Sequence, residues 1–462
     1  MSAVALILAA GEGTRMRSDL PKVAHRVLGV PMVRLVAESA EKAGCEVVVI
    51  TGHKAQAVES LLSGVTFVRQ ECQLGTAHAV LCAKDALAGV EGSLVVLSGD
   101  TPLIRPETIR SMIDLREGSS AAVMVLTAEV DDPSGYGRIV RGQDGSMLGI
   151  VEHKDATAQQ LAIREVNTGT YCFDAQALFE HLDRVGSENS QGEFYLTDMV
   201  SLFREEGLGV VSAKVEDAQE LLGVNTRVQL AEATAWLQAR VNEQHMLAGV
   251  TMTDPSTVWI GPEVRIGRDV VIEPMTTILG NTVIEDGCHI GPSSRIEDSE
   301  ISGAARVDSS VVLSARIGDG ATVGPFTYLR PGTVLMEGAK AGAFVEIKNS
   351  EVGPDSKVPH LSYIGDATIG RNVNVGAGSI TCNYDGARKS KTIIEDGAFV
   401  GSDTMLIAPV RIGRDAVTAA SSAISSDVPD GALGIERCEQ RQVPGWAERR
   451  QSRRKGPDDT KE

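Results

Sequence analysis

Three features are missing from the 462-residue sequence: a long apolar run, a cysteine cluster and an excess of basic charge. The longest apolar run near the start, Val4 to Ala10, is far shorter than the ~20 residues that a membrane span needs. It also lacks the charged leader and the cleavage site of a secretory signal, so it is better interpreted as a buried strand. We therefore expect no membrane partner.

The cysteines and the charge exclude further classes of protein. Seven cysteines are scattered along the chain without a Cys-x-x-Cys pair, which predicts reduced thiols, a cytoplasmic protein and no zinc site. The formal net charge of −18 argues against a nucleic-acid partner, because such proteins normally carry a basic footprint. It leaves phosphorylated substrates open, since a few local Lys and Arg residues are enough to bind them.

Part of the C-terminal half has an isoleucine at every sixth position. A six-residue period fits neither a helix nor an ordinary strand, so it indicates a repeat in which three units make one triangular coil. The repeats predict a parallel β-helix of about ten coils, and hexapeptide prisms of known structure are left-handed, which we expect here by resemblance. The repeated positions are Ile260, Ile266, Ile272, Ile278, Ile284, Ile290 and Ile296.

Residues 1–227 alternate short β-branched runs with helical patterns. This alternation predicts a Rossmann-like α/β domain with a mainly parallel sheet, whose ligands bind at the carboxyl ends of the strands. A linker helix is expected over 228–248, begun by the capping box Thr226-Arg-Val-Gln229. The β-helix domain, with a flexible C-terminal tail, is expected over 249–462. Strands are expected at 4–8, 47–50, 94–97, 121–126 and 169–173, and helices at 32–43 and 77–88.

A glycine-rich string, Leu8-Ala-Ala-Gly-Glu-Gly-Thr-Arg-Met16, follows the first expected strand, and Pro21-Lys22 comes shortly after it. The glycines at 11 and 13 let the backbone approach a phosphate chain, whose charge Arg15 and Lys22 can offset. A glycine-rich turn alone can be no more than a tight connection, and no Gly-Lys-Ser/Thr of a Walker loop follows. The longer string resembles the Leu-x-x-Gly-x-Gly-Thr-Arg-Met…Pro-Lys signature of nucleotide-sugar pyrophosphorylases.

Further segments are similar to the nucleotide, sugar and metal contacts of that family. The resemblance implies that Arg15 and Lys22 are catalytic and that Asp100 and Asn225 hold Mg²⁺, although an Asp at a strand end is often only a cap. Ser98 stands where many relatives carry Tyr, and is expected to make its contact through the backbone. The implied UTP- and product-binding residues are Leu8, Ala9, Ala10, Gly11, Lys22, Gln70, Gly75, Thr76, Ser98, Gly99, Asp100, Gly137, Glu152, Asn167 and Asn225.

The six-residue repeat is interrupted by residues Asn383 to Lys391, which should loop outward. Breaks in a regular solenoid are where function is usually mounted. An isolated histidine on a coil is often only a structural hydrogen-bonding group, but here it belongs to a longer string: Arg330, Lys348, His360, Tyr363 and Asn374. Together with the N-terminal motifs, this string resembles, over nearly the whole chain, the family of bacterial bifunctional N-acetylglucosamine-1-phosphate uridylyltransferase / glucosamine-1-phosphate N-acetyltransferases.

By that resemblance His360 is the general base of acetyl transfer, and an imidazole with a pKa near ~6.5 suits the task at neutral pH. The implied substrate-binding residues of this site are Arg330, Lys348, Tyr363 and Asn374. The implied acetyl-CoA-binding residues are Ala377, Asn383, Tyr384, Ser402, Ala420 and Arg437.

The family resemblance implies a homotrimeric enzyme that makes UDP-N-acetylglucosamine for cell-wall peptidoglycan and lipopolysaccharide, and so supports cell shape. Its substrates would be glucosamine-1-phosphate, acetyl-CoA, N-acetylglucosamine-1-phosphate and UTP. Two alternatives remain: a single-activity sugar-1-phosphate nucleotidyltransferase with a regulatory β-helix, and an inactive scaffolding subunit. The string around His360 argues against the first, and intact Arg15, Lys22, Asp100 and Asn225 argue against the second.

Overall fold

The computed structural model describes residues 3–454 of the chain, with side chains to residue 451. The chain divides into two compact units, Met1–His245 with Trp259–Glu263 and Met246–Val258 with Val264–Glu462. Helix α8 (Arg227–Leu247) occupies the place of the expected linker, and the domain boundaries themselves stay a prediction. Residues 455–462 of the expected flexible tail lie outside the described residues.

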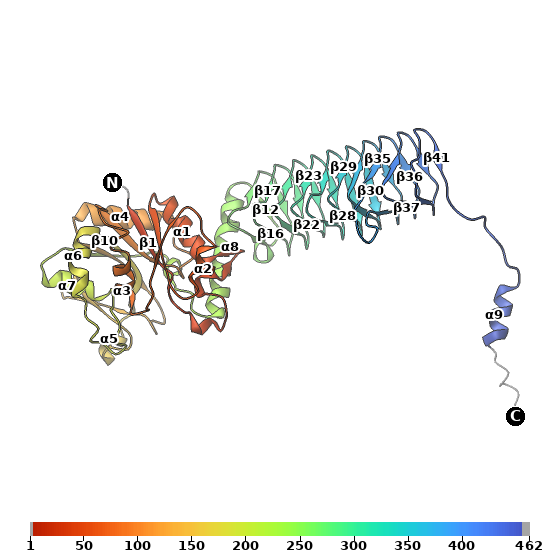
Figure 1. Cartoon of the computed structure of the whole chain (residues 1–462). Helices are drawn as coiled ribbons and strands as arrows, with labels where there is room; N and C mark the ends of the chain where they lie inside the picture. The colour runs from red at the N-terminus through yellow and green to blue at the C-terminus, as the bar shows by residue number, and fades with distance from the viewer. Residues whose placement is uncertain (1–2, 455–462) are drawn as a thin grey trace, which may run out of the picture. The chain divides into compact units, whose positions relative to one another are not determined.

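The first unit is built on one mixed sheet with the strand order β11-β7-β10-β6-β1-β4-β5; Figure 1 labels β10 and β1. Apolar, β-branched runs make its central strands, which are buried because helices cover both faces. Strand β10 runs antiparallel to β6 and β7, whereas the other pairs along this order are parallel. The strands are β1 (Val4–Leu8), β4 (Glu46–Thr51), β5 (Thr66–Arg69), β6 (Ser93–Ser98), β7 (Val123–Glu129), β10 (Glu165–Asp174) and β11 (Val210–Lys214).

Two hydrophobic cores, one on each face of this sheet, hold the helices. One core takes in residues of α1 (Met32–Lys42), α2 (Ala55–Glu59) and α4 (Pro106–Ser119). The other takes in residues of α3 (Thr76–Cys82), α6 (Ala175–His181) and α7 (Asp198–Glu205). The helix expected over 77–88 is shorter than predicted, because the chain leaves α3 at Cys82 and continues in hydrogen-bonded turns. A hairpin of β8 (Arg138–Arg141) and β9 (Met147–Val151) pairs with β10, and α5 (Ala158–Leu161) follows it.

The predicted capping box is present at the start of α8. The Gln229 carboxamide oxygen accepts from the backbone N–H groups of Asn225 at 2.8 Å and Thr226 at 3.1 Å. The Thr226 hydroxyl accepts in turn from the Gln229 N–H at 3.2 Å. These bonds satisfy donors that a helix start otherwise leaves open, so they fix the chain just ahead of the helix.

The second unit contains three parallel sheets of eleven, ten and nine short strands, from β12 (Thr251–Met252) to β41 (Leu433–Gly434). The chain visits the three sheets in turn, so that each strand from β12 to β37 pairs with the strand three places later, and Figure 1 shows the resulting stack of coils. At the end of the stack β39 pairs with β41 instead. The repeated isoleucines point inward, as Ile272, Ile278 and Ile290 illustrate with no exposed surface. The predicted β-helix of about ten coils is confirmed.

One coil is much longer than its neighbours. Asn374 pairs with Phe399, 25 positions later, whereas Lys357 pairs with Asn374 after 17 positions and Phe399 with Val417 after 18. The extra residues lie between β34 (Ile380–Cys382) and β35 (Thr392–Ile394), where Tyr384 and Lys389 form an isolated antiparallel bridge. The predicted outward loop over 383–391 is therefore confirmed.

After the last coil the chain forms a short helix, α9 (Trp446–Arg454), within the stretch where a flexible C-terminal tail was expected. Among the described residues, none of the helices combines the length and the apolar content that crossing a bilayer requires.

Candidate active sites

A pocket of about 260 Å³ opens at the carboxyl ends of β1 and β6. These strands lie side by side in parallel, and the Gly99 N–H that follows β6 donates to the Leu8 carbonyl at 2.9 Å. We call this cavity the glycine-loop pocket. It brings together ten of the residues predicted to bind nucleotide: Leu8, Ala9, Ala10, Gly11, Lys22, Gln70, Gly75, Thr76, Ser98 and Asp100.

Four charged or polar groups from separate segments meet at one side of this pocket. The Lys22 ammonium forms an ion pair with Oδ2 of Asp100 and donates to Oδ1 of Asn225 at 3.2 Å. The Arg15 guanidinium donates to the same Asn225 oxygen at 2.7 Å. The Val224 N–H donates to the Asp100 carbonyl at 2.9 Å, so backbone as well as side chains join the two segments.

The oxygens of Asp100 and Asn225 fit a magnesium ion. One ammonium group contacts both of them, so they lie close enough together to share a single small cation. A carboxylate and an amide oxygen are also hard ligands of the kind that Mg²⁺ binds.

Contacts within the site explain why position 13 is a glycine and what the Ser98 side chain does. Gly13 has a positive φ of 65°, and a Cβ atom there would lie 2.4 Å from the Cβ of Lys22. Glycine therefore lets the loop pass close enough to hold the lysine against the strand ends. The Ser98 hydroxyl donates to Oδ1 of Asp100 at 2.6 Å, so its side chain supports the carboxylate, a contact that the sequence did not predict.

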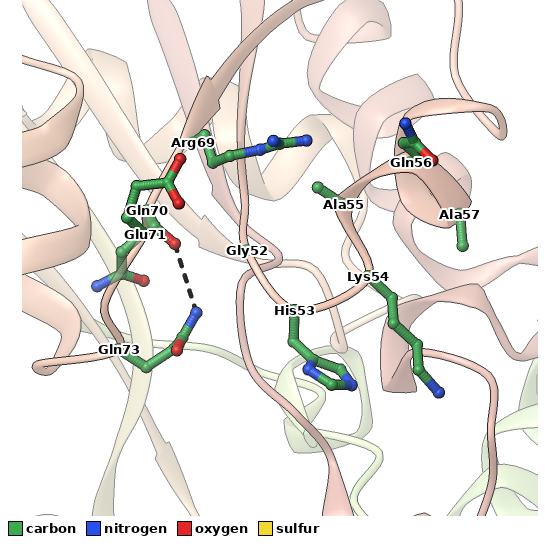
Figure 2. Close-up of a pocket in the computed structure, with 10 residues that line it drawn as sticks. All are labelled: Gly52, His53, Lys54, Ala55, Gln56, Ala57, Arg69, Gln70, Glu71 and Gln73. Carbon is green, nitrogen blue, oxygen red and sulfur yellow. Dashed lines mark hydrogen bonds between the residues drawn. The ribbon is translucent and has the colours of Figure 1, made fainter.

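Two glutamine side chains, Gln70 and Gln73, form part of the wall of the glycine-loop pocket. Gln70 is only 3% exposed, and its Nε2 lies 3.3 Å from the Gly75 carbonyl and 2.9 Å from Nδ1 of His78. Gln70 and Gln73 also border a second hollow of about 590 Å³, which lies between the segments that follow β4 and β5 (Figure 2). Figure 2 shows the Gln73 amide turned back to the Gln70 carbonyl, at 3.4 Å.

Gly137, Glu152 and Asn167, which belong to the predicted UTP- and product-binding set, form a separate cluster on the β8–β10 side of the unit. The Asn167 N–H donates to the Gly137 carbonyl at 2.8 Å, and a Cβ on Gly137 would lie 3.3 Å from a Glu152 carboxylate oxygen. Burial raises the pKa of Glu152, and neighbouring carboxylates raise it further against a hydrogen bond from Thr197. Thr197 was not singled out in the sequence, because its position in a loop before α7 carries no motif.

In the β-helix, Arg330, Lys348 and Tyr363 belong to successive coils of one sheet. Arg330 follows β25 (Tyr328–Leu329), while Lys348 and Tyr363 lie in β28 (Glu346–Lys348) and β31 (Tyr363–Gly365). Arg330 forms an ion pair with Glu346 at 2.8 Å. A Cβ on Gly365 would lie 2.5 Å from the Tyr363 hydroxyl and 2.9 Å from Nδ2 of Asn383, so the glycine leaves room for both groups.

His360 is exposed at the end of β30 (Lys357–His360), one corner before Tyr363. Asn374, in β33 (Asn374–Val375), pairs with Lys357 at the start of that strand. The histidine therefore lies on the outside of the coil and within one turn of both Tyr363 and Asn374.

The outward loop adds a second ammonium group beside Lys348. The neighbouring Lys389 ammonium lowers the pKa of Lys348, because two like charges close together disfavour each other. A cavity of about 410 Å³ lies under the loop and is bordered by Lys389, Lys391 and Asp366. The sequence predicted this loop, but its spacing did not show that Lys389 would turn back to Lys348.

Four of the six residues predicted to line acetyl-CoA form a column along one corner of consecutive coils. The N–H groups of Asp403 and Ser421 donate to the carbonyls of Ala377 and Ser402 at 2.7 and 2.8 Å, and the Arg437 guanidinium donates to the Ala420 carbonyl at 3.2 Å. Asn383 is buried and donates to Asp366, whereas Tyr384 is 60% exposed on the loop. The structure thus brings together the predicted residues Ala377, Ser402, Ala420 and Arg437.

Comparisons with known proteins agree with this division of the chain. The model of the MobA-like NTP transferase domain matches residues 5–193, and that of the bacterial transferase hexapeptide (six repeats) matches residues 258–298. The bifunctional protein GlmU of Heliobacterium modesticaldum is 51% identical over 435 residues, which cover 94% of this chain and 95% of its own. Those of Exiguobacterium sp. and Syntrophomonas wolfei are 50% and 46% identical over 97% and 96% of this chain, and over 100% and 99% of their own.

Fold and sites together define a two-part transferase, in which an NTP transferase is joined by a helix to a left-handed parallel β-helix of hexapeptide repeats. The predicted fold class is thereby confirmed. The identity extends over nearly the full length, and the chain belongs to the bifunctional GlmU family. The prediction of a bifunctional uridylyltransferase and N-acetyltransferase is confirmed as well, in preference to a single-activity enzyme.

Proposed function

We propose that the glycine-loop pocket binds UTP, with the nucleobase against Gln70 and Gly75 and the phosphates over the glycine-rich loop. Gly137, Glu152 and Asn167 hold N-acetylglucosamine-1-phosphate, and Gly99 keeps the strand ends together behind the phosphates. The observation that carries the proposal is the meeting of Arg15, Lys22, Asp100 and Asn225 at the carboxyl edge of the sheet.

The reaction at this site needs alignment and charge neutralisation. An oxygen of the sugar phosphate attacks the α-phosphorus of UTP in line, and pyrophosphate leaves. The attacking group is already an anion, so the site needs no strong base, and Arg15 and Lys22 neutralise the charge that spreads over the phosphates. Mg²⁺, held by Asp100 and Asn225, supplies further neutralisation of the triphosphate when it is bound.

The second site, on the β-helix, transfers an acetyl group. His360 takes a proton from the amine of glucosamine-1-phosphate, the amine nitrogen attacks the thioester carbon of acetyl-CoA, and the CoA thiolate leaves. Arg330 and Lys348 bind the sugar phosphate, and Lys389 adds to the same positive field. Tyr363 and Asn374 position the sugar, while acetyl-CoA lies along the column of Ala377, Ser402, Ala420 and Arg437, with Asn383 and Tyr384 near its thioester.

We propose a homotrimer assembled through the β-helix. Phe326, Phe344 and Leu361 project from successive coils at one corner and are 60%, 60% and 62% exposed. The two rings stack at 5.3 Å, and all three residues have positive φ angles, which bulky side chains rarely adopt. A regular apolar ridge of this kind supports burial against copies of the same chain.

We also propose that the enzyme acts in the cytoplasm. All seven cysteines are free thiols, as is typical of proteins in a reducing compartment.

Two variants separate the sites. Asp100→Ala is expected to abolish UTP-dependent release of pyrophosphate and leave acetyl transfer intact, and His360→Ala is expected to do the reverse. Each reaction is measured separately, with pyrophosphate release for the first and free CoA thiol for the second. Loss of both activities in either folded variant would contradict the two-site proposal.

A further inference from the structure

The first turn of α8 carries an arginine that reaches back to the glycine-rich segment. The Nε of Arg227 donates to the Met16 carbonyl at 3.3 Å, and its Nη1 lies 3.3 Å from Nδ1 of His25. Met16 and His25 are buried, at 1% and 4% exposure. One guanidinium group therefore binds both the Met16 carbonyl and the His25 ring, which are nine positions apart in the sequence.

Met16 and His25 each lie close to a side chain proposed to be catalytic, Arg15 or Lys22. Met16 ends the short helix η1 (Thr14–Met16), which contains Arg15. His25 follows the short helix η2 (Lys22–Ala24), and its N–H donates to the Lys22 carbonyl at 3.3 Å. Movement of Met16 or His25 would move Arg15 or Lys22.

The segment just ahead of α8 carries Asn225, another member of the site. Asn225 lies two residues before Arg227, and the capping box ties the Asn225 N–H to Gln229 at 2.8 Å. We infer that Arg227 and His25 form a clasp that sets Arg15 and Lys22 against Asn225 and Asp100 for uridylyl transfer. Arg227 and His25 are positioning residues, and this inference rests on the proposed function of the glycine-loop pocket.

The chemistry of His25 supports this role. Arginine can only donate, so Nδ1 of His25 must accept, and the ring must be neutral with its proton on Nε2. Burial and the charge of Arg227 lower the pKa of His25, which keeps the ring neutral. Nε2 is buried and has no hydrogen-bond partner among the described residues. An apolar residue of similar size would fill this space without leaving a buried N–H unpaired, so the imidazole is explained by the bond that it accepts.

The test uses Arg227→Met, Arg227→Lys, His25→Leu and His25→Gln in the full chain. Arg227→Met is expected to lower kcat of uridylyl transfer about tenfold to a hundredfold and to raise the Mg²⁺ concentration for half activation, because the cations and the metal ligands lose alignment. KM for the sugar phosphate, which Arg227 does not contact, should change less than about twofold. Acetyl transfer is the internal measure of folded enzyme, and Arg184→Met, at a half-exposed pair with Glu206, is the matched control.

Rescue distinguishes positioning from bulk stability. Arg227→Lys and His25→Gln each keep one donor or acceptor and should retain more uridylyl transfer than Arg227→Met and His25→Leu. Arg227→Met with His25→Leu should lose no more than the worse single variant, since both remove the same link.

An unchanged kcat in Arg227→Met, or a double variant whose losses multiply, would overturn the clasp. So would equal losses in His25→Gln and His25→Leu. These outcomes leave the proposed function standing, provided that Lys22→Met abolishes uridylyl transfer. If Lys22→Met retained uridylyl transfer, the proposed function of the glycine-loop pocket would be wrong.

Discussion

Lys22 and Asp100 are 78 positions apart in the sequence and form an ion pair at the carboxyl edge of the sheet. Their side chains are 18% and 10% exposed, so the pair is largely shielded from solvent. The same ammonium group contacts Asn225, and it lies where the two proposed metal ligands converge. A divalent cation that binds Asp100 and Asn225 must therefore compete with Lys22, unless the phosphates of a nucleotide draw the lysine away.

This competition gives a prediction for metal binding. Lys22→Met should abolish uridylyl transfer, yet bind Mn²⁺, as a probe for Mg²⁺, about threefold to tenfold more tightly in the absence of nucleotide. Paramagnetic resonance of free Mn²⁺ measures this binding without any catalysis. Lys42→Met, at the exposed end of α1, is the matched control. Weaker or unchanged Mn²⁺ binding in Lys22→Met would contradict the proposed metal ligands.

The raised pKa of Glu152 gives a prediction for stability against pH. A carboxyl group whose pKa is raised in the folded state binds more protons there than in the unfolded state, so stability falls as pH rises through that window. Glu152→Gln removes the free-energy cost of burying the charged carboxylate. It should therefore raise the melting temperature of the first unit by about 2–4 °C at pH 7.5. The gain should shrink as the pH falls below the ordinary glutamate pKa of about 4.3, where Glu152 becomes protonated in both states.

Calorimetry of the full chain at several pH values measures that trend. Glu46→Gln, at an exposed strand end, should show no such pH-dependent gain. The same Glu152 variant should raise KM for N-acetylglucosamine-1-phosphate about tenfold, since an amide replaces the acceptor of a sugar hydroxyl. A variant that destabilises the protein at pH 7.5 would refute the assignment of burial as the dominant cause.

Gly365 should be needed for acetyl transfer and dispensable for the fold. An alanine Cβ would displace the Tyr363 hydroxyl and the Asn383 amide, both of which are ends of side chains that can move. Gly365→Ala is expected to lower kcat/KM for acetyl transfer about tenfold to a hundredfold and to leave uridylyl transfer unchanged. Gly303→Ala, where the nearest atom would be 3.5 Å away, is the matched control. Equal effects of the two substitutions would argue against a role of Tyr363 in positioning the sugar.

The adjacent ammonium groups of Lys348 and Lys389 predict a binding site for the phosphate of the sugar substrate. Lys389→Met should raise KM for glucosamine-1-phosphate about tenfold and leave KM for acetyl-CoA unchanged, because only the sugar carries its phosphate next to Lys348. It should also raise the pKa of Lys348 toward its ordinary value, which NMR of labelled lysines can follow. Lys340→Met, on an exposed strand position, serves for comparison. An increased KM for acetyl-CoA alone would place Lys389 with the other substrate.

Patterns that depend on local geometry were predictable from the sequence. The six-residue period determines which side chains point into the coil, and the box Thr226-Arg-Val-Gln229 predicts a helix start, because both depend on neighbours in the chain. The interruption of the six-residue repeat at Asn383 to Lys391 likewise predicted the outward loop. The helix after Thr76 was predicted too long, because helical spacing does not show where tertiary contacts end a helix.

Contacts that depend on the direction of a flexible side chain were not predictable. The bond from the Ser98 hydroxyl to Asp100, the approach of Lys389 to Lys348 and the reach of Arg227 to His25 carry no periodic signal. Thr197 comes next to Glu152 only because α7 packs beside β9. Such residues are found only when the elements that carry them are placed in space.

Complementation tests the central claim most directly, namely that the chain holds two independent sites connected by a free intermediate. Asp100→Ala and His360→Ala proteins are supplied, separately and mixed, with glucosamine-1-phosphate, acetyl-CoA, UTP and Mg²⁺, and UDP-N-acetylglucosamine is measured. Each variant alone should form none, and the mixture should form it at a rate within about tenfold of the unaltered enzyme, because N-acetylglucosamine-1-phosphate diffuses from one protein to the other. A mixture that stays inactive, or a single variant that forms the product alone, would contradict the account.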